Sequence, residues 1–168
     1  MISFFKSRSY KSALTSHSNF NYKPTISSYN TGATVGIVSD LAHKVSVQKF
    51  IKDQFGTQSD VSTIYYSEEE SESPDIYTKK QVNWAGIPKC EAIDIFLQKE
   101  YDRFYYLDTK MNLHQAYIAH LAKAKFTIGP YLDYDEHHFD LTLEIAELNI
   151  EKLLSEIKKN QKLLSNLS

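Results

Sequence analysis

The sequence has little of what cross-links a fold or crosses a membrane. Its single cysteine, Cys90, excludes an intrachain disulfide and a cysteine-based zinc cluster, which fits a reducing compartment. No run approaches the roughly 18 apolar residues that a membrane-spanning helix needs. The first residues also lack the continuous apolar core of a signal peptide. We therefore expect a cytoplasmic protein without a transmembrane segment.

Glycine is scarce as well, with five in 168 residues, and none lies where a nucleotide-binding loop needs it. The turn after the first apolar run reads Ser39-Asp40-Leu41-Ala42-His43. A dinucleotide site needs glycines in that turn, because backbone amides must approach the pyrophosphate closely. No P-loop pattern occurs either. We therefore predict no cofactor.

Acidic residues are absent from the start of the chain, where the first one is Asp40. The net charge of −2 therefore divides into +4 for residues 1–39 and −6 for the remainder. We predict a basic N-terminal arm, residues 1–33, that can contact a protein or a nucleic acid. The alternative is a solvated terminus without a partner. The basic residues of the arm are Lys6, Arg8, Lys11 and Lys23.

The apolar residues, 42% of the chain, follow two periodicities. Short runs rich in β-branched and aromatic residues predict strands at 34–39, 61–66, 76–78, 102–107, 126–128 and 139–145. Apolar residues spaced three and four apart predict helices at 47–55, after Pro88, at 113–121 and at 150–164. On the third of these helices, we expect His120 to lie in the core with a hydrogen-bond partner.

Strands that alternate with helices favour a parallel sheet covered on both faces. Because crossovers between parallel strands are right-handed, the expected fold is a Rossmann-like three-layer α/β/α sandwich with a mostly parallel sheet. We expect one such domain over residues 34–168, following the arm.

Ligands of open α/β sheets bind at the carboxyl ends of the strands, near the point where the strand order reverses. Asp40 and Asp108 each follow a predicted strand, so they are candidate ligand-binding residues. The alternative is that both carboxylates cap the helix or turn that follows.

The segment Asn83–Lys89 is irregular and holds the only tryptophan, Trp84. This ring can stack on a base or a sugar while Lys89 and neighbouring lysines contact phosphate. The alternative, which we favour from the sequence, is that Trp84 is a buried plug that seats the loop on the sheet.

The densest group of metal-ligand residue types runs from Asp133 to Asp140 and includes His137 and His138. Adjacent residues of an extended segment point to opposite sides, so the two histidines cannot chelate together. We predict a polar surface loop and no metal site.

Several of these segments resemble a family of small proteins from Bacteroidota whose domain has no assigned function. The most specific motif is K-x-x-N-W-x-G-x-P-K, matched by Lys80, Asn83, Trp84, Gly86, Pro88 and Lys89. Further matches are Tyr101-Asp102, Ala124–Gly129 and Phe139–Ile145. The resemblance adds Asn83 to the candidate ligand-binding residues. In place of an acid near the end of one strand of the family, this chain has Tyr106, and Asp108 lies two residues on.

A more distant resemblance is to the N-terminal half of heptosyltransferase-type glycosyltransferases, through Tyr101-Asp102 and the Ala124-Lys125 strand. It implies the fold more than the activity. The preferred hypothesis is a non-catalytic binding or interaction module, with no catalytic residue assigned. The alternative is a degenerate or partner-dependent sugar or nucleotide transferase with its site at the strand carboxyl ends. Self-association through the C-terminal helix is a third possibility.

Overall fold

The structure is a computed structural model that describes residues 32–132, 139–147 and 149–165. Residues 1–31, which make up nearly all of the predicted arm, lie outside the described residues. So does 133–138, which holds most of the candidate metal-ligand group.

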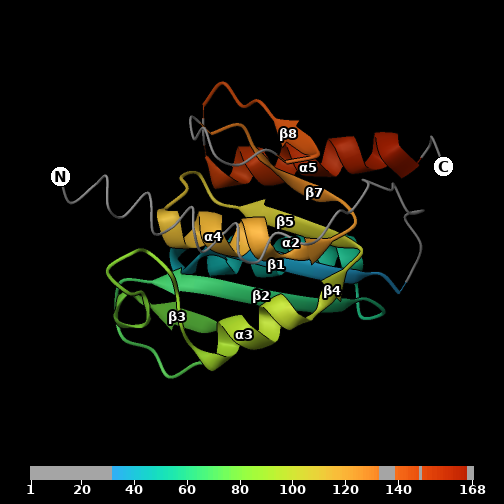
Figure 1. The fold of residues 1–168 in the computed structure, drawn as a ribbon. Helices are drawn as coiled ribbons and strands as arrows, with labels where there is room; N and C mark the ends of the chain where they lie inside the picture. The colour runs from blue at the N-terminus through green and yellow to red at the C-terminus, as the bar shows by residue number, and fades with distance from the viewer. Residues whose placement is uncertain (1–31, 133–138, 148, 166–168) are drawn as a thin grey trace.

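Six parallel strands form the central sheet, in the order β3-β2-β1-β5-β7-β8 (Figure 1). The predicted parallel sheet is therefore confirmed. A second, two-stranded sheet pairs β4 with β6. The strands are β1 (Thr34–Asp40), β2 (Asp60–Ser67), β3 (Ile76–Thr78), β4 (Glu100–Tyr101), β5 (Arg103–Leu107), β6 (Lys123–Ala124), β7 (Thr127–Pro130) and β8 (Leu141–Leu143).

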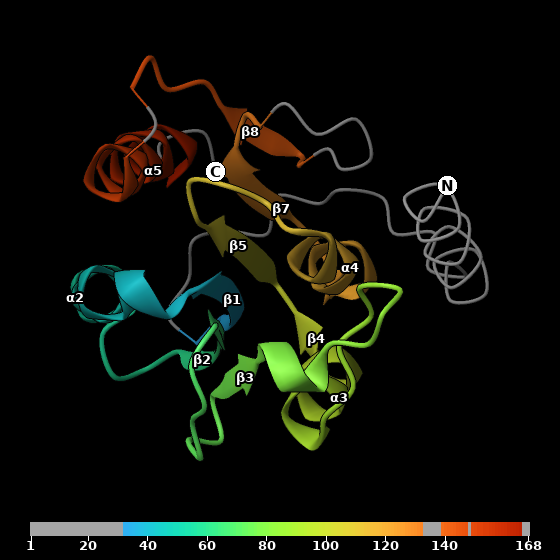
Figure 2. The ribbon, with the colours of Figure 1, turned by 90° about the vertical axis from the view of Figure 1, so that its left-hand side faces the viewer.

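Helices cover both faces of the sheet, which gives the predicted three-layer Rossmann-like arrangement (Figure 2). The helices α2 and α5 pack on one face, and α3 and α4 pack on the other. Their bounds are α2 (Lys44–Phe55), α3 (Glu91–Gln98), α4 (Leu113–Leu121) and α5 (Ile150–Ser165). Two 3-10 turns, η1 (Leu41–His43) and η2 (Lys79–Gln81), follow β1 and β3.

Side chains of the buried strands alternate between the two layers, because successive residues of a strand point to opposite faces. Ile37 of β1 packs under α2 and α5, whereas Val38 packs under α3 and α4. Tyr105 and Tyr106 of β5 divide in the same way. The two cores together bury the strand residues that the sequence marks as apolar.

Two local predictions are wrong. Pro88 does not open a helix: α3 begins at Glu91, and Pro88 instead forms an antiparallel bridge with Val82. His120 is exposed rather than buried, because the buried residues of α4 run from Gln115 to Ala119.

The chain runs outward from β1 through β2 to β3, then returns to the other side of β1 and continues through β5, β7 and β8. The strand order therefore reverses between β1 and β5. At that point the carboxyl ends of two adjacent strands lead away to opposite faces of the sheet, which leaves room for a ligand between them.

Candidate functional site

The reversal point brings Asp40 and Asp108 to neighbouring strand ends. Ser39, the residue before Asp40, is paired with Leu107, the residue before Asp108. Asp40 is the N-cap of η1, where its Oδ1 accepts a hydrogen bond of 2.9 Å from the backbone amide of Ala42. The prediction that Asp40 caps the following turn is therefore confirmed.

Asp108 is completely buried. Its Oδ1 accepts a 2.6 Å hydrogen bond from the amide of Thr109, and its Oδ2 accepts one of 3.0 Å from Nε2 of Gln115. Nε2 of His43 lies 3.5 Å from Oδ1. Burial raises the pKa of Asp108, although the hydrogen bonds from Thr109 and Gln115 and the nearby His43 oppose that shift.

Gln115 connects the carboxyl group of Asp108 to Tyr106 of β5. The side chain of Gln115 is fully buried, and its Oε1 accepts hydrogen bonds of 3.1 Å from the Tyr106 hydroxyl and from the amide of Asn112. Tyr106 therefore reaches Asp108 through one amide group. Sequence reasoning did not single out Gln115, although its position three residues after Asn112 is a capping-box signal.

Three rings meet at the ends of β2 and β3. The ring of His114 lies 4.3 Å from the ring of Tyr66, and its Nδ1 is 2.7 Å from the Tyr77 hydroxyl. Burial lowers the pKa of His114 to about 4 and raises the pKa of Tyr77 well above its usual value. At neutral pH, Tyr77 is therefore the donor to Nδ1, and the ring hydrogen of His114 is on Nε2.

The side chain of Trp84, on the loop after η2, is exposed to solvent. Trp84 is 67% exposed, so the prediction of a buried plug is wrong. Oδ1 of Asn83 accepts hydrogen bonds of 3.0 Å from the amides of Ala85 and Ile87. The amide of Asn83 donates to the carbonyl of Ile87, 3.0 Å away. Asn83 thus fixes the backbone on both sides of Trp84, so the exposed ring is carried by an ordered turn.

This loop rests on the first turn of α4. Gly86 has a φ of +82°, and a Cβ at that position would lie 2.5 Å from Cδ2 of Leu113. Only glycine combines this left-handed backbone with so close an approach. Leu113 immediately precedes His114 and Gln115 on α4, so the loop contacts the same helix that carries these two side chains.

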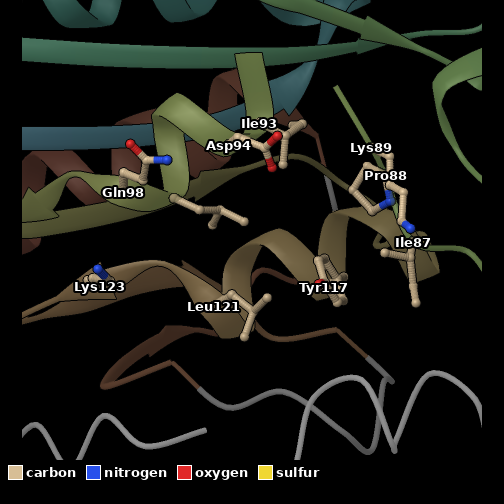
Figure 3. A pocket seen from close by; sticks show the side chains of 10 residues that line it. Ile87, Pro88, Lys89, Ile93, Asp94, Gln98, Tyr117, Leu121 and Lys123 are labelled. Carbon is tan, nitrogen blue, oxygen red and sulfur yellow. The ribbon is translucent and has the colours of Figure 1, made fainter. Parts of the chain in front are cut away.

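A groove of about 400 Å³ opens between α3, α4 and the loop. Figure 3 shows side chains of both helices directed toward it, with the loop at one end. Lys89 lines this groove, whereas neither Asp40 nor Asp108 does. The apolar residues that line it are Ile87, Pro88, Ile93, Leu97, Tyr117 and Leu121, and the other polar ones are Asp94, Gln98 and Lys123.

The five predicted site residues therefore fall into two groups. Asp40 and Asp108 lie at the strand-order reversal, and Asn83, Trp84 and Lys89 lie on the loop. Of these five residues, Asn83 orders the loop through hydrogen bonds to its backbone. Lys80 forms an ion pair with Glu70 of the acidic loop.

The residues that carry the distant transferase resemblance lie at the opposite edge of the sheet. Nζ of Lys125 is 2.7 Å from Oδ1 of Asp102, whose Oδ2 accepts hydrogen bonds from the amide and hydroxyl of Thr34. These contacts join the amino ends of β1 and β5 to the start of β7. Asp102 and Lys125 therefore hold the sheet together and do not line the candidate site.

Within the described residues, no three His, Cys, Asp or Glu side chains gather closely enough to hold a metal ion. Asp140, the described member of the predicted polar loop, accepts hydrogen bonds from the amide and hydroxyl of Thr127. Among the same residues, no helix combines the length and hydropathy needed to cross a membrane.

The topology and the reversal-point cluster define an α/β protein of Rossmann-like fold. The chain belongs to a family of unknown function, DUF6913, whose model matches residues 4–164. That match covers the sheet, both helical layers and nearly all of the basic segment. No curated protein and no solved structure matches this chain.

Proposed function

We propose that this protein is a non-catalytic binding module and that the loop Asn83–Lys89 is its contact with a partner. One observation carries the proposal: Trp84 is 67% exposed on a turn that the Asn83 side chain fixes. Tryptophan is enriched among the residues that contribute most to binding at protein interfaces, and an ordered support lowers the entropic cost of using it.

The surroundings of Trp84 support recognition of a partner with both apolar and charged groups. Lys89, on the same loop, lines the groove between α3 and α4, whose other lining residues are both apolar and charged. The basic arm is a second proposed contact, through Lys6, Arg8, Lys11 and Lys23. The family model begins at residue 4, which supports a shared role for this segment.

Replacing the ring tests the proposal. The full-length tagged chain is used to recover partners from cells, and the recovered proteins and RNA are quantified. Trp84→Ala should lose a specific partner, whereas Tyr131→Ala should keep it, since Tyr131 is exposed to a similar degree, 62%, at the end of β7. Equal recovery by both variants would contradict a role of the loop. Deletion of residues 1–30 measures how much the basic arm contributes to partner recovery.

A transferase acting on sugars or nucleotides is the second candidate. It is favoured by the 3.5 Å approach of His43 to the fully buried Asp108 at the strand-order reversal. An imidazole close to a buried carboxyl group can act as a general base in proton transfer.

Thermal shift against nucleotides and sugar nucleotides distinguishes the two candidates, because a ligand that binds only the folded state raises its stability. A compound that raises the melting temperature of the wild type and of His120→Ala, but not of His43→Ala, supports the transferase. No response to any of them supports the binding module.

We also propose that the protein works in the cytoplasm of Bacteroidota, as one Rossmann-like domain over 34–168 that follows the arm. The half-buried free thiol of Cys90 supports a reducing compartment.

A further inference from the structure

The strand β2 is paired along most of its length on one side only. On the β1 side the residues from Asp60 to Tyr66 have partners, whereas on the other side β3 pairs only with Tyr65–Ser67. Among the described residues, 60–64 therefore form an open edge. The turn at Pro74-Asp75 leads the chain into β3 and ends the pairing there, with the carbonyl of Asp75 2.8 Å from the Tyr65 amide.

The direction of that hydrogen bond shows which backbone groups face the open side. Because successive residues of a strand direct their N–H and C=O groups to opposite sides, Thr63 and Val61 share the orientation of Tyr65. Their amides and carbonyls therefore point away from β1. Between Asp60 and Ile64, these backbone groups are available to an added strand.

A cavity lies directly against this edge. It is an open pocket with a volume of about 360 Å³ that is lined by the strand, by α3 and by the Pro74 turn. Ile95 of α3 lines it and is 52% exposed, although it is a large apolar residue. The residues around the cavity are Ser62, Thr63, Ile64, Pro74, Asp75, Ala92, Ile95, Phe96 and Lys99.

We propose that an extended segment of a partner protein adds to the sheet at residues 60–64 of β2. Its backbone pairs with Val61 and Thr63, and every second side chain enters the cavity against Ile95 and Phe96. Strand addition of this kind takes its affinity from backbone hydrogen bonds and its specificity from pockets for alternate side chains. The proposal concerns a different surface from the Trp84 loop and does not depend on it.

Charge at the edge identifies the chemistry of the segment. Nζ of Lys99 is 2.8 Å from the Ser62 hydroxyl and 3.9 Å from the Asp60 carboxylate, near the middle of the open stretch. A second copy of β2, paired antiparallel about Ser62, would bring two Lys99 ammonium groups together, and the exposed Asp60 carboxylate, 3.9 Å from Lys99, offsets that repulsion only in part. A segment with apolar residues at alternate positions and a carboxylate near Lys99 avoids that repulsion.

The test selects ligands from a phage-displayed library of random linear peptides on the immobilised full chain. Enriched peptides are synthesised and their affinity is measured by isothermal titration calorimetry. We expect apolar residues at every second position and an acidic residue. Thr63→Pro removes only the outward amide, because residues 62 and 64 donate to β1, so binding should weaken by at least about tenfold. Thr63→Val keeps the amide and should bind within about twofold of the wild type.

A second pair of variants keeps the test decisive if Thr63→Pro fails to fold. Ile95→Glu places a charge in the cavity and should abolish binding, whereas Val45→Glu alters an exposed residue of α2 and should not. The proposal is overturned if no peptide is enriched, or if Thr63→Pro and Ile95→Glu bind as the wild type does. Sedimentation that shows a dimer which Thr63→Pro abolishes would assign the edge to a second copy and would also overturn it.

Discussion

Nδ1 of His114 lies 2.7 Å from the hydroxyl oxygen of Tyr77. This contact joins the first turn of α4 to the outermost strand, β3, and the ring of His114 also packs on Tyr66. The imidazole is therefore neutral in the folded protein, with a pKa of about 4 that burial lowers from the usual 6.5. The carboxyl edge of the sheet contains a titrating group whose protonation opposes folding.

The stability of the protein should fall as the pH is lowered from about 6.5 to about 4. The pKa of His114 is lower in the folded state than in the unfolded chain, so protons bind preferentially to the unfolded chain in that interval. The full loss attributable to His114 is about 3 kcal/mol. Urea unfolding of the wild type and of His114→Gln at a series of pH values gives the free energy of unfolding as a function of pH. The contribution of His114 is the difference between the two profiles over this interval.

The matched control for this experiment is His120→Gln, because His120 is the exposed histidine of the same helix. Its profile should follow that of the wild type. If His114→Gln keeps the full pH dependence, the pKa of His114 is the same in the folded and unfolded chain, and burial does not lower it.

Gly86→Ala should destabilise the protein by at least about 2 kcal/mol, because the new Cβ combines a left-handed backbone with overpacking against Leu113. Leu113→Ala removes the side chain that the Cβ meets. In that background the same substitution should cost less, leaving mainly the backbone strain. A double-mutant cycle by thermal or urea unfolding measures this coupling. Strictly additive effects would show that the loop does not rest on Leu113.

Asn83→Ala should release the Trp84 loop, since the amides of Ala85 and Ile87 lose their shared acceptor. The expected cost is about 1–2 kcal/mol in unfolding free energy. The steady-state anisotropy of Trp84 fluorescence should fall, and partner recovery with it. Asn83→Asp keeps an acceptor oxygen and should retain the wild-type anisotropy. Equal anisotropy in the wild type and Asn83→Ala would show that other contacts order the loop.

Asp102→Asn should lower the stability of the protein, because it alters contacts at the amino ends of the strands, and it should leave partner recovery unchanged. The substitution removes the charge that pairs with Lys125, at a cost of about 1 kcal/mol. The hydrogen bond from Lys125 lowers the pKa of Asp102, so the wild type should lose this contribution as the pH falls below about 4, and Asp102→Asn should not. Loss of partner recovery in a folded Asp102→Asn would instead place the site at this edge.

The sheet and its helices follow closely from the sequence, because hydrophobic periodicity reports which residues face a core. The run 34–39 alternates between the two layers, and Val47 and Phe50 mark the inner face of α2 as predicted. The parallel arrangement follows from the alternation of strands with helices and the right-handed crossover. The strand ends, and hence the positions of Asp40 and Asp108, follow in turn.

The environments of the site residues do not follow in this way. Trp84 is of a residue type that is usually buried, yet its side chain is exposed. The loop that carries it is ordered by hydrogen bonds to Asn83 and packs through Gly86 against Leu113. His120 lies on an apolar stripe, but α4 turns Gln115 inward instead. Both outcomes depend on contacts between segments that are distant in sequence.

The sequence by itself determined the fold class, the order of strands and helices and the edge of the sheet at which candidate residues gather, because these depend on local periodicity and chain connectivity. Only the tertiary structure decided that Asp108 is buried beside His43, that Trp84 faces water and that β2 has an open edge. Burial and pairing are set by what packs against a residue, and those partners come from elsewhere in the chain.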